Sequence, residues 1–434
     1  MSNLKFNIIT FGCKVNQSES ESIITNMINN GFEFVDSNSK EKPEIIIINS
    51  CTVTAESDRK LRQCIHRVRR ENENLIIVLI GCMPQAFPKI AYSFEDIQIV
   101  LGNTNKQKVS LYIKEYLQNK IRILRVEEIN HTKKFEENLP SCSKERYRAF
   151  LKIQDGCDRF CSYCIIPYAR GRVRSKPLDI IKNDVINLCN NGYREVVLTG
   201  INLSSYGKDL NCTLYEAVKL VCNIEGVDRV RLGSLEPDLM TEALIDNLSE
   251  EKKLCPQFHL SLQSGSNTVL KKMRRLYTRE EYLNIVKMIR NKIPNATFTT
   301  DIMVGFSGET EEDFQESINI ISEVGFIKVH VFPYSLRPGT LAEKFGDTLS
   351  RNKKTQRVQK IIEISNKISK IIMEGFIDFE MDVLYETLDY DGFYKGYTSN
   401  YIPVKTKSNF DIRGKIIRTI LKSVDKDFCI GIIK

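Results

Sequence analysis

The sequence predicts an α/β protein in three parts: a doubly wound N-terminal α/β domain, a central incomplete (β/α)6 barrel and a small antiparallel β-barrel at the C-terminus. Three observations predict this. Apolar runs rich in β-branched residues alternate with helical stretches up to residue 104, as buried parallel strands require. A second series of six such units begins near residue 148, and short alternating runs follow Gly375. We expect domains at 1–104, 148–375 and 376–434, with 105–147 as a connecting segment.

Length and composition indicate a globular protein of the cytosol. The 434 residues are too many for one hydrophobic core, and 42% of them are hydrophobic and 27% charged. The sequence contains no apolar run long enough to cross a bilayer, and residues 1–12 lack the pattern of a signal peptide. We therefore expect a cytoplasmic monomer with no membrane partner.

The N-terminal domain places cysteines where its strands end. Strands are expected at 4–13, 43–51, 74–82 and 97–103, and the first three end in Cys13, Cys51 and Cys82. The carboxyl ends of parallel strands share one edge of a sheet, where ligands bind, so these thiols can converge. The alternative is three core residues, since free cysteine packs well. Each follows a Gly or Ser at a strand-to-helix turn, which favours a functional role.

The central domain carries a second group of cysteines after its first strand. Cys157, Cys161 and Cys164 have the spacing C-x-x-x-C-x-x-C in QDGCDRFCSYC. A closed zinc site needs four ligands, and no further Cys or His stands in register. Thiolates also suit iron–sulfur clusters, and three of them leave one iron of a four-iron cubane open. Strands are expected at 148–156, 194–202, 228–236, 257–265, 297–306 and 327–335, with functional groups at their carboxyl ends.

Basic and aromatic residues indicate a polyanionic partner. Basic runs occupy 59–70, 170–176 and 271–279, although any one of them could be a solvated helix face. In the C-terminal module, basic residues are interleaved with aromatic ones, as in single-stranded nucleic-acid binders. An ordinary barrel core with solvated lysines explains the composition equally well. The aromatic residues are Tyr394, Tyr397, Tyr401 and Phe410.

These motifs resemble the methylthiotransferase family of radical S-adenosylmethionine (SAM) enzymes over essentially the full length. The resemblance is carried by FGCKVNQSES, NSCTVT, IGCMPQ, IQDGCDRFCSYCIIPYARGRVRS, LTGINL, SLQSGSNTVLKKMRR, DIMVGFSGETEEDF and VHVFPYSLRPGT, and the last module resembles the TRAM domain. GCKVNQ, CTVT and CIIPYARG most resemble the transfer-RNA enzymes that act on N6-threonylcarbamoyladenosine at position 37, beside the anticodon. Relatives acting on isopentenyladenosine or on a ribosomal-protein aspartate are alternatives, and a non-catalytic zinc-containing RNA-binding protein is a remote one.

The resemblance implies two [4Fe–4S] clusters, and SAM, as cofactors. It assigns Cys157, Cys161 and Cys164 to the cluster that binds SAM, and Cys13, Cys51 and Cys82 to an auxiliary cluster that binds sulfur. It also implies two SAM molecules per product. One methylates sulfur, and the other gives the 5′-deoxyadenosyl radical that takes hydrogen from adenine C2. The implied partners are the tRNA anticodon stem-loop and an electron donor such as flavodoxin or ferredoxin.

Further cofactor contacts are expected beside these cysteines. They are Tyr163 and, where barrel strands end, Gly200, Asn202, Glu236, Gln263 and Asp301, any of which could instead be structural. Arg170 and Arg172 are candidates for the cofactor carboxylate or for RNA. Ser261 and Ser307 stand where the family has proline, which puts local loop shape in doubt. The remaining cysteines are expected in the core or on the surface: Cys64, Cys142, Cys189, Cys212, Cys222, Cys255 and Cys429.

Overall fold

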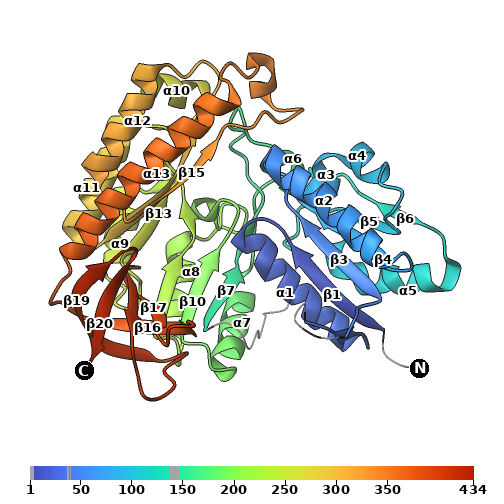
Figure 1. Cartoon of the computed structure of the whole chain (residues 1–434), viewed down its shortest axis with the longest axis horizontal. Coiled ribbons are helices and arrows are strands. Elements are labelled where there is room, and N and C mark those ends of the chain that lie inside the picture. Colours follow the sequence, from blue (N-terminus) through green and yellow to red (C-terminus); the bar gives the residue numbers. More distant parts are fainter. Residues whose placement is uncertain (1–3, 37–38, 40, 137–146) are drawn as a thin grey trace.

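A computed structural model describes residues 4–36, 39, 41–136 and 147–434, and its elements fall into three parts (Figure 1). The N-terminal part is drawn in blue, the partial barrel in green to orange and the small barrel in red. Cys142 lies outside the described residues. No helix in the described ranges has both the length and the apolar character of a membrane span.

The N-terminal part is a parallel sheet, as its apolar runs predicted. The strands lie in the order β2-β1-β3-β4-β5-β6. This order reverses between β1 and β3, and such a reversal opens a crevice at the carboxyl ends of the strands. Strands β2 and β6 are additions to the prediction, and β6 extends the sheet into the expected connecting segment. The bounds are β1 (Lys5–Thr10), β2 (Glu33–Phe34), β3 (Ile45–Ser50), β4 (Ile76–Gly81), β5 (Ile99–Leu101) and β6 (Ile123–Arg125).

Helices cover both faces of this sheet. On one face α1 (Lys14–Asn29) and α5 (Val109–Asn119) pack over a core around Phe6, and on the other lies α2 (Ala55–Glu71) with the short α3 (Cys82–Ala86) and α4 (Pro88–Tyr92). Helix α2 buries Leu61, Ile65 and Val68 and leaves most of its basic side chains outside. The basic run 59–70 therefore lies on an exposed helix face, as either a solvated face or a polyanion-binding surface requires.

All six predicted strands of the central barrel are present, but they form two sheets. One has the order β11-β10-β7 and the other β12-β13-β14-β15. The third predicted strand changes partner at Gly233, because β11 pairs with β10 whereas β12 pairs with β13. The bounds are β7 (Arg148–Lys152), β10 (Glu195–Thr199), β11 (Arg229–Leu232), β12 (Ser234–Leu235), β13 (Gln257–Leu260), β14 (Thr297–Val304) and β15 (Lys328–Pro333).

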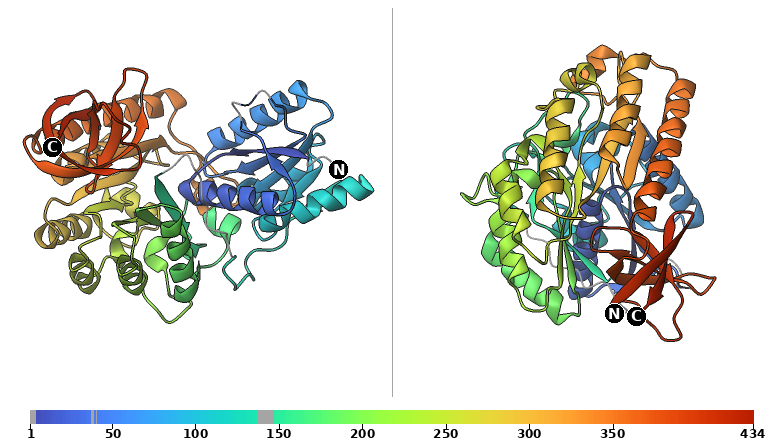
Figure 2. Two further views of the ribbon diagram at one scale, coloured as in Figure 1. Left: turned by 90° about the horizontal axis from the view of Figure 1, so that it is seen from below. Right: turned by 90° about the vertical axis from the view of Figure 1, so that its left-hand side faces the viewer.

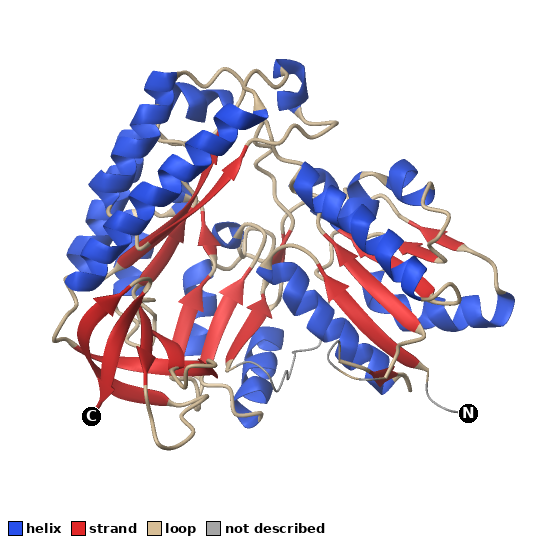
Figure 3. Ribbon diagram, viewed as in Figure 1, coloured by secondary structure: helices blue, strands red, loops and turns tan. Residues whose placement is uncertain are grey.

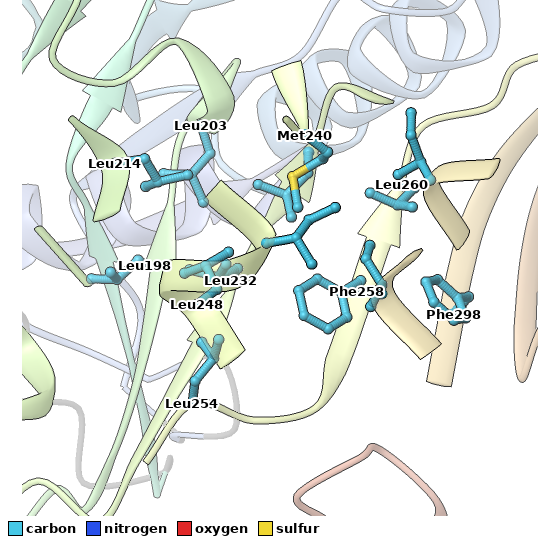
Figure 4. Close-up of a cluster of buried hydrophobic side chains, with 14 of the residues drawn as sticks. Leu198, Leu203, Leu214, Leu232, Met240, Leu248, Leu254, Phe258, Leu260 and Phe298 are labelled. Atoms are coloured by element: carbon cyan, nitrogen blue, oxygen red, sulfur yellow. The ribbon is translucent and has the colours of Figure 1, made fainter. Parts of the chain in front are cut away.

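Helices cover the outer face of this barrel (Figure 3). The largest core cluster lies between them and the strands, and Figure 4 shows Leu198, Leu232, Phe258 and Phe298 within it. Thr278 and Thr310 begin α11 and α12 with capping boxes. The bounds are α7 (Leu178–Asn190), α8 (Leu214–Cys222), α9 (Glu242–Ser249), α10 (Asn267–Lys272), α11 (Arg279–Lys292), α12 (Glu311–Val324) and α13 (Arg351–Glu374).

The N-terminal part lies against the side of the barrel between β7 and the loop after β15 (Figure 1). On the β7 side, Ser18 Oγ of α1 donates to the Phe150 carbonyl at 3.2 Å. On the other side, Arg337 Nη2 donates at 2.8 Å to Oγ1 of Thr52, the residue that follows Cys51. The N-terminal part thereby bridges the two edges of the partial barrel, β7 and β15, and the inner face of the barrel strands is named the lumen.

The C-terminal module is a closed barrel in the order β16-β17-β18-β20-β19, with the parallel pair β18 and β20 completing an otherwise antiparallel arrangement. It packs against the amino ends of the central strands, where Arg148 donates two hydrogen bonds to Glu386, both at 2.8 Å. Figure 2 shows the barrel from two further sides. The bounds are β16 (Glu380–Leu388), β17 (Tyr394–Thr398), β18 (Pro403–Thr406), β19 (Ile416–Asp425) and β20 (Phe428–Ile433).

The four aromatic residues expected to meet nucleic acid have three different environments. Tyr394 is buried in the barrel core, so for this residue the structural alternative is correct. Tyr397 and Tyr401 stack on each other at 4.5 Å between ring centroids, and the guanidinium of Arg148 lies over both rings. Phe410 alone among the four is exposed at the surface.

Candidate functional site

Cys13, Cys51 and Cys82 meet at the reversal point of the N-terminal sheet. Cys13 caps α1 after β1, Cys51 follows β3, and Cys82 begins α3 after β4. Gly12 has a φ of +108°, and a Cβ there would lie 2.7 Å from Cys51 Cβ, so the turn passes directly over Cys51. Burial and the neighbouring Cys82 thiol raise the pKa of Cys51 to about 12. The three thiols are close enough to influence one another.

Cys157, Cys161 and Cys164 lie on a loop closed by β8 (Gln154–Asp155) and β9 (Arg174–Ser175). Gly156 lets this loop form, because its φ is +74° and a Cβ would lie 1.8 Å from the Arg172 carbonyl oxygen. Burial raises the pKa of Cys157 to about 11, and the Cys161 thiol adds to that shift. Burial and Cys161 also raise the pKa of Cys164.

Nitrogen donors surround the sulfur atoms of this second triad. Asn202 Nδ2 donates to Cys157 Sγ at 3.7 Å, and Arg275 Nη1 donates to Cys161 Sγ at 3.4 Å. Arg275 is held by Glu236 and by the Ser261 carbonyl at 3.0 Å. Arg275 is therefore the one arginine of the basic run 271–279 that lies in the site. Nothing in the sequence distinguished it from its solvated neighbours.

The other expected cofactor contacts are spread along the upper lumen. A Cβ on Gly200 would lie 2.7 Å from Gln154 Oε1, so this turn packs closely on β8. Tyr163 meets the Phe306 ring edge-on at 6.4 Å. Gln263, with a φ of +72°, carries a buried amide oxygen without a partner among the described residues, and so does Asn202. Asp301 instead accepts a hydrogen bond from His259 Nε2 at 3.2 Å.

Arg170 links the first triad to the loop that carries the second. It is fully buried, and its Nε lies 3.1 Å from Cys82 Sγ. Its Nη2 donates to Asn16 Oδ1 at 2.5 Å, and that oxygen also accepts from Cys13 Sγ at 3.9 Å. Asn103 adds a second link, since its Nδ2 lies 3.8 Å from Cys82 Sγ and 2.6 Å from the Ala169 carbonyl.

The basic run 170–176 is thus largely an interior feature. Arg170, Arg174 and Lys176 are buried, so the expectation that this run grips RNA is wrong for those three residues. Arg172 is exposed and lies 3.4 Å from Asp158. Sequence alone could not separate them, because the alternation of buried and exposed side chains here depends on the domain interface.

A buried charge network supports Arg170. Glu19 accepts from Arg170 Nη1 at 2.5 Å and lies 2.6 Å from both Lys106 Nζ and Lys152 Nζ. These cations hold the pKa of Glu19 well below its usual range despite burial. Asp155 lies 2.6 Å from Lys152 Nζ and carries a second negative charge. The network fixes the interface between the two domains beside the thiols.

The residues present fit iron–sulfur clusters. Among the described residues, no group of three or more His, Cys, Asp or Glu side chains is arranged to hold a single metal ion. A cubane requires another arrangement, with one thiolate at each of three irons and hydrogen-bond donors to the sulfurs. The two triads offer these thiols, and their sulfur atoms receive N–H groups from Asn202, Arg275, Arg170 and Asn103.

Comparisons with known proteins agree with this geometry. The family model described as Radical SAM superfamily matches residues 151–321, and the one described as uncharacterized protein family UPF0004 matches 5–102. The solved structure of the radical SAM methyltransferase TsrM from Kitasatospora setae, with tryptophan and a SAM analog bound, shares the fold with a TM-score of 0.56 at 13% identity, covering 76% of this chain and 73% of that one. Fold and site together define a radical SAM enzyme.

Two curated relatives narrow the class. The chain is 36% identical over 423 residues to the threonylcarbamoyladenosine tRNA methylthiotransferase MtaB of Bacillus subtilis, covering 95% of this chain and 93% of the relative. It is 37% identical over 393 residues to the tRNA-2-methylthio-N(6)-dimethylallyladenosine synthase of Pelotomaculum thermopropionicum, covering 88% and 86%. The chain therefore belongs to the radical SAM methylthiotransferase family.

Proposed function

We propose that this enzyme converts N6-threonylcarbamoyladenosine at position 37 of tRNA into its 2-methylthio derivative, in the cytoplasm. The observation that carries the proposal is the domain interface at which Arg170 and Asn103 tie Cys82 of the first triad to the loop that carries the second. A methylthio group can replace hydrogen on a substrate only where a radical source and a sulfur source reach the same carbon. The relatives named for threonylcarbamoyladenosine support the choice of base.

The proposal assigns the cofactors to the chain's own thiols. Cys157, Cys161 and Cys164 would hold a [4Fe–4S] cluster with SAM, and Cys13, Cys51 and Cys82 a second cluster. When bound, these groups supply the radical that takes hydrogen from adenine C2 and the methylthio group that replaces it. The side-chain oxygens of Asn202 and Gln263 have no hydrogen-bond partner among the described residues. Each can therefore accept a hydrogen bond from an amino or hydroxyl group of the cofactor.

The protein residues around the lumen bind and position the substrate. The N-terminal domain covers the side of the barrel between β7 and the loop after β15. An adenine enters only if it leaves the stack of the anticodon loop, as modified bases do in other enzymes. The basic C-terminal barrel stands at the other end of the lumen and is the proposed contact for the loop's phosphates.

The direct test is nucleoside analysis of tRNA from cells that lack this protein. We expect 2-methylthio-N6-threonylcarbamoyladenosine to disappear and its unmethylthiolated precursor to accumulate, while the dimethylallyl derivative is unchanged. A plasmid copy should restore the product, and a copy with Cys157→Ala should not. Loss of the dimethylallyl product instead would assign the chain to the other tRNA subgroup, and normal levels of both would overturn the tRNA proposal.

A further inference from the structure

The lower half of the lumen is polar and lined by imidazole and carboxylate groups. Phe258, Phe298 and Val329 face the outer core, so strand alternation turns His259, Asp301 and His330 inward. Asp301 and His330 are register partners on β14 and β15, and the rings of His259 and His330 lie 5.9 Å apart. An apolar ligand here would remove water from these groups without replacing its hydrogen bonds.

Lys14 enters this lumen from the N-terminal domain. It is the first residue of α1, and its ammonium lies 5.8 Å from the centre of the Phe150 ring on β7. Lys14 is solvent-exposed, and the Phe150 ring that it covers lies on the inner face of β7, because the alternating Ala149 and Leu151 are buried on the outer face. Arg148 shares this face of β7 with Phe150, and the guanidinium groups of Arg148 and Arg231 both lie over the Tyr401 ring.

Lys14 differs from the neighbouring arginines in lacking a counter-ion among the residues described. Arg148 is paired with Glu386 at 2.8 Å, and Arg231 with Glu195 at 2.8 Å. In the described part of the chain, Lys14 has no carboxylate within ion-pair distance. Holding an ammonium among other cations without a counter-ion is unfavourable, and a bound anion would relieve it.

The N6 substituents of the two candidate bases differ in charge, because only one of them is anionic. The threonylcarbamoyl group ends in a free carboxylate and carries a hydroxyl, whereas the dimethylallyl group is a hydrocarbon. On adenine, C2 and the carbon that carries N6 are both bonded to the ring nitrogen N1, so a substituent on N6 begins near the reacting carbon. Cys13 is the neighbour of Lys14 in the chain and belongs to the triad assigned to the sulfur source.

We propose that Lys14 binds the carboxylate of the threonylcarbamoyl group and thereby determines the enzyme's choice of substrate. The proposal rests on the proposed function and deepens it. His259 and His330, which lie side by side on the inner face of β13 and β15, would accommodate the polar remainder of the substituent. A buried site built for a charged, hydrogen-bonding group rejects an analogue that lacks it, because its own polar groups are then left unpaired.

The test is a binding cycle with synthetic anticodon stem-loop RNA. Loops carrying threonylcarbamoyladenosine, its neutral methyl ester, dimethylallyladenosine or plain adenosine are titrated anaerobically into the cluster-loaded enzyme. Lys14→Gln should weaken binding of the carboxylate loop by about tenfold, the effect of losing one charge-assisted hydrogen bond. It should leave the other three loops unchanged. The conservative Lys14→Arg should retain most of the preference, and Lys287→Gln, an exposed lysine on α11, should change nothing.

The outcomes separate this inference from the proposed function. If the wild-type enzyme prefers the carboxylate loop and Lys14→Gln retains that preference, the role of Lys14 is wrong while the proposed substrate stands. If the wild-type enzyme does not prefer the carboxylate loop, the proposed substrate is wrong. Equal weakening of all four loops by Lys14→Gln would also overturn the inference, since it would reveal a general structural effect. If the glutamine variant folds poorly, its iron content will reveal this, and the Lys14→Arg variant then provides the test.

Discussion

Arg170 illustrates how one side chain can serve two domains. Its guanidinium meets Cys82 and Asn16 of the N-terminal domain, while its backbone belongs to the loop that carries the second triad. Buried arginines are retained where several acceptors match the planar fork. Here the acceptors are two Glu19 oxygens, an amide oxygen and a thiol sulfur. The side chain thus holds the interface together and also donates to Cys82, a proposed cluster ligand.

The contribution of Arg170 to the stability of the folded protein can be measured in the absence of cofactors. In the metal-free protein, we expect Arg170→Met to lower the free energy of unfolding by about 3 kcal/mol, the lower end of the range for breaking a buried ion pair. Lys106 and Lys152 continue to neutralise Glu19, which limits the loss. Urea unfolding followed by circular dichroism gives the value.

Arg172→Met is the matched control for that measurement. Arg172 lies two residues away and forms an exposed ion pair with Asp158 at 3.4 Å. Exposed pairs contribute little, so the change should stay within about 0.5 kcal/mol. Equal effects of the two substitutions would contradict the assignment of Arg170 to the interface.

At the scale of the element, the turn from β1 to α1 limits the space available to the Cys51 side chain. Gly12 and Gly31 both have positive φ, +108° and +89° respectively. A Cβ on Gly12 would lie 2.7 Å from Cys51 Cβ and 3.1 Å from its sulfur, whereas a Cβ on Gly31 would meet nothing within 4 Å. The same substitution at the two positions therefore separates backbone strain from displacement of the Cys51 side chain.

Gly12→Ala should selectively remove the auxiliary iron. After anaerobic reconstitution, the wild-type chain should hold about eight irons, as two four-iron clusters require, and Gly12→Ala about four. Gly31→Ala should keep about eight and lose only the roughly 1 kcal/mol of stability that left-handed strain costs. Iron and sulfide analysis gives the numbers. Wild-type protein with about four irons would refute a second cluster, and full loading of Gly12→Ala would refute the packing argument.

The elements also show what the sequence could and could not predict. Continuous apolar runs identified every central strand, and the cysteines at strand ends indicated their convergence, because both depend on local pattern and parallel topology. The two-residue strand β2 and the split of the barrel at Gly233 depend on pairing partners distant in the chain. The burial of Arg170 and Arg275 likewise follows from tertiary contacts, and their surrounding residues resemble solvated charge runs.

At the scale of the whole molecule, positive charge is divided between the interior and the surface. The interior cations around the thiols are matched by Glu19 and Asp155, and Lys14 faces the lumen. The exposed cations of the C-terminal barrel include Lys407 and Lys415, which have no ion-pair partner among the residues described. Each lies over an aromatic ring, Lys407 over Phe393 at 4.9 Å and Lys415 over Phe410 at 5.8 Å.

These two kinds of cation should respond differently to salt. Phosphate contacts release counter-ions, so each contact to single-stranded RNA adds about 0.7 to the slope of log affinity against log salt. Replacing Lys407 and Lys415 together by glutamine should lower that slope by about 1.4 and weaken all anticodon loops alike, whichever base they carry. Lys422→Gln is the control, since Lys422 is already paired with Asp378 at 2.8 Å on the same barrel. An unchanged slope in the double variant would mean that the barrel does not contact the RNA backbone. A loss of affinity confined to the carboxylate loop would mean that these lysines, rather than Lys14, recognise the base.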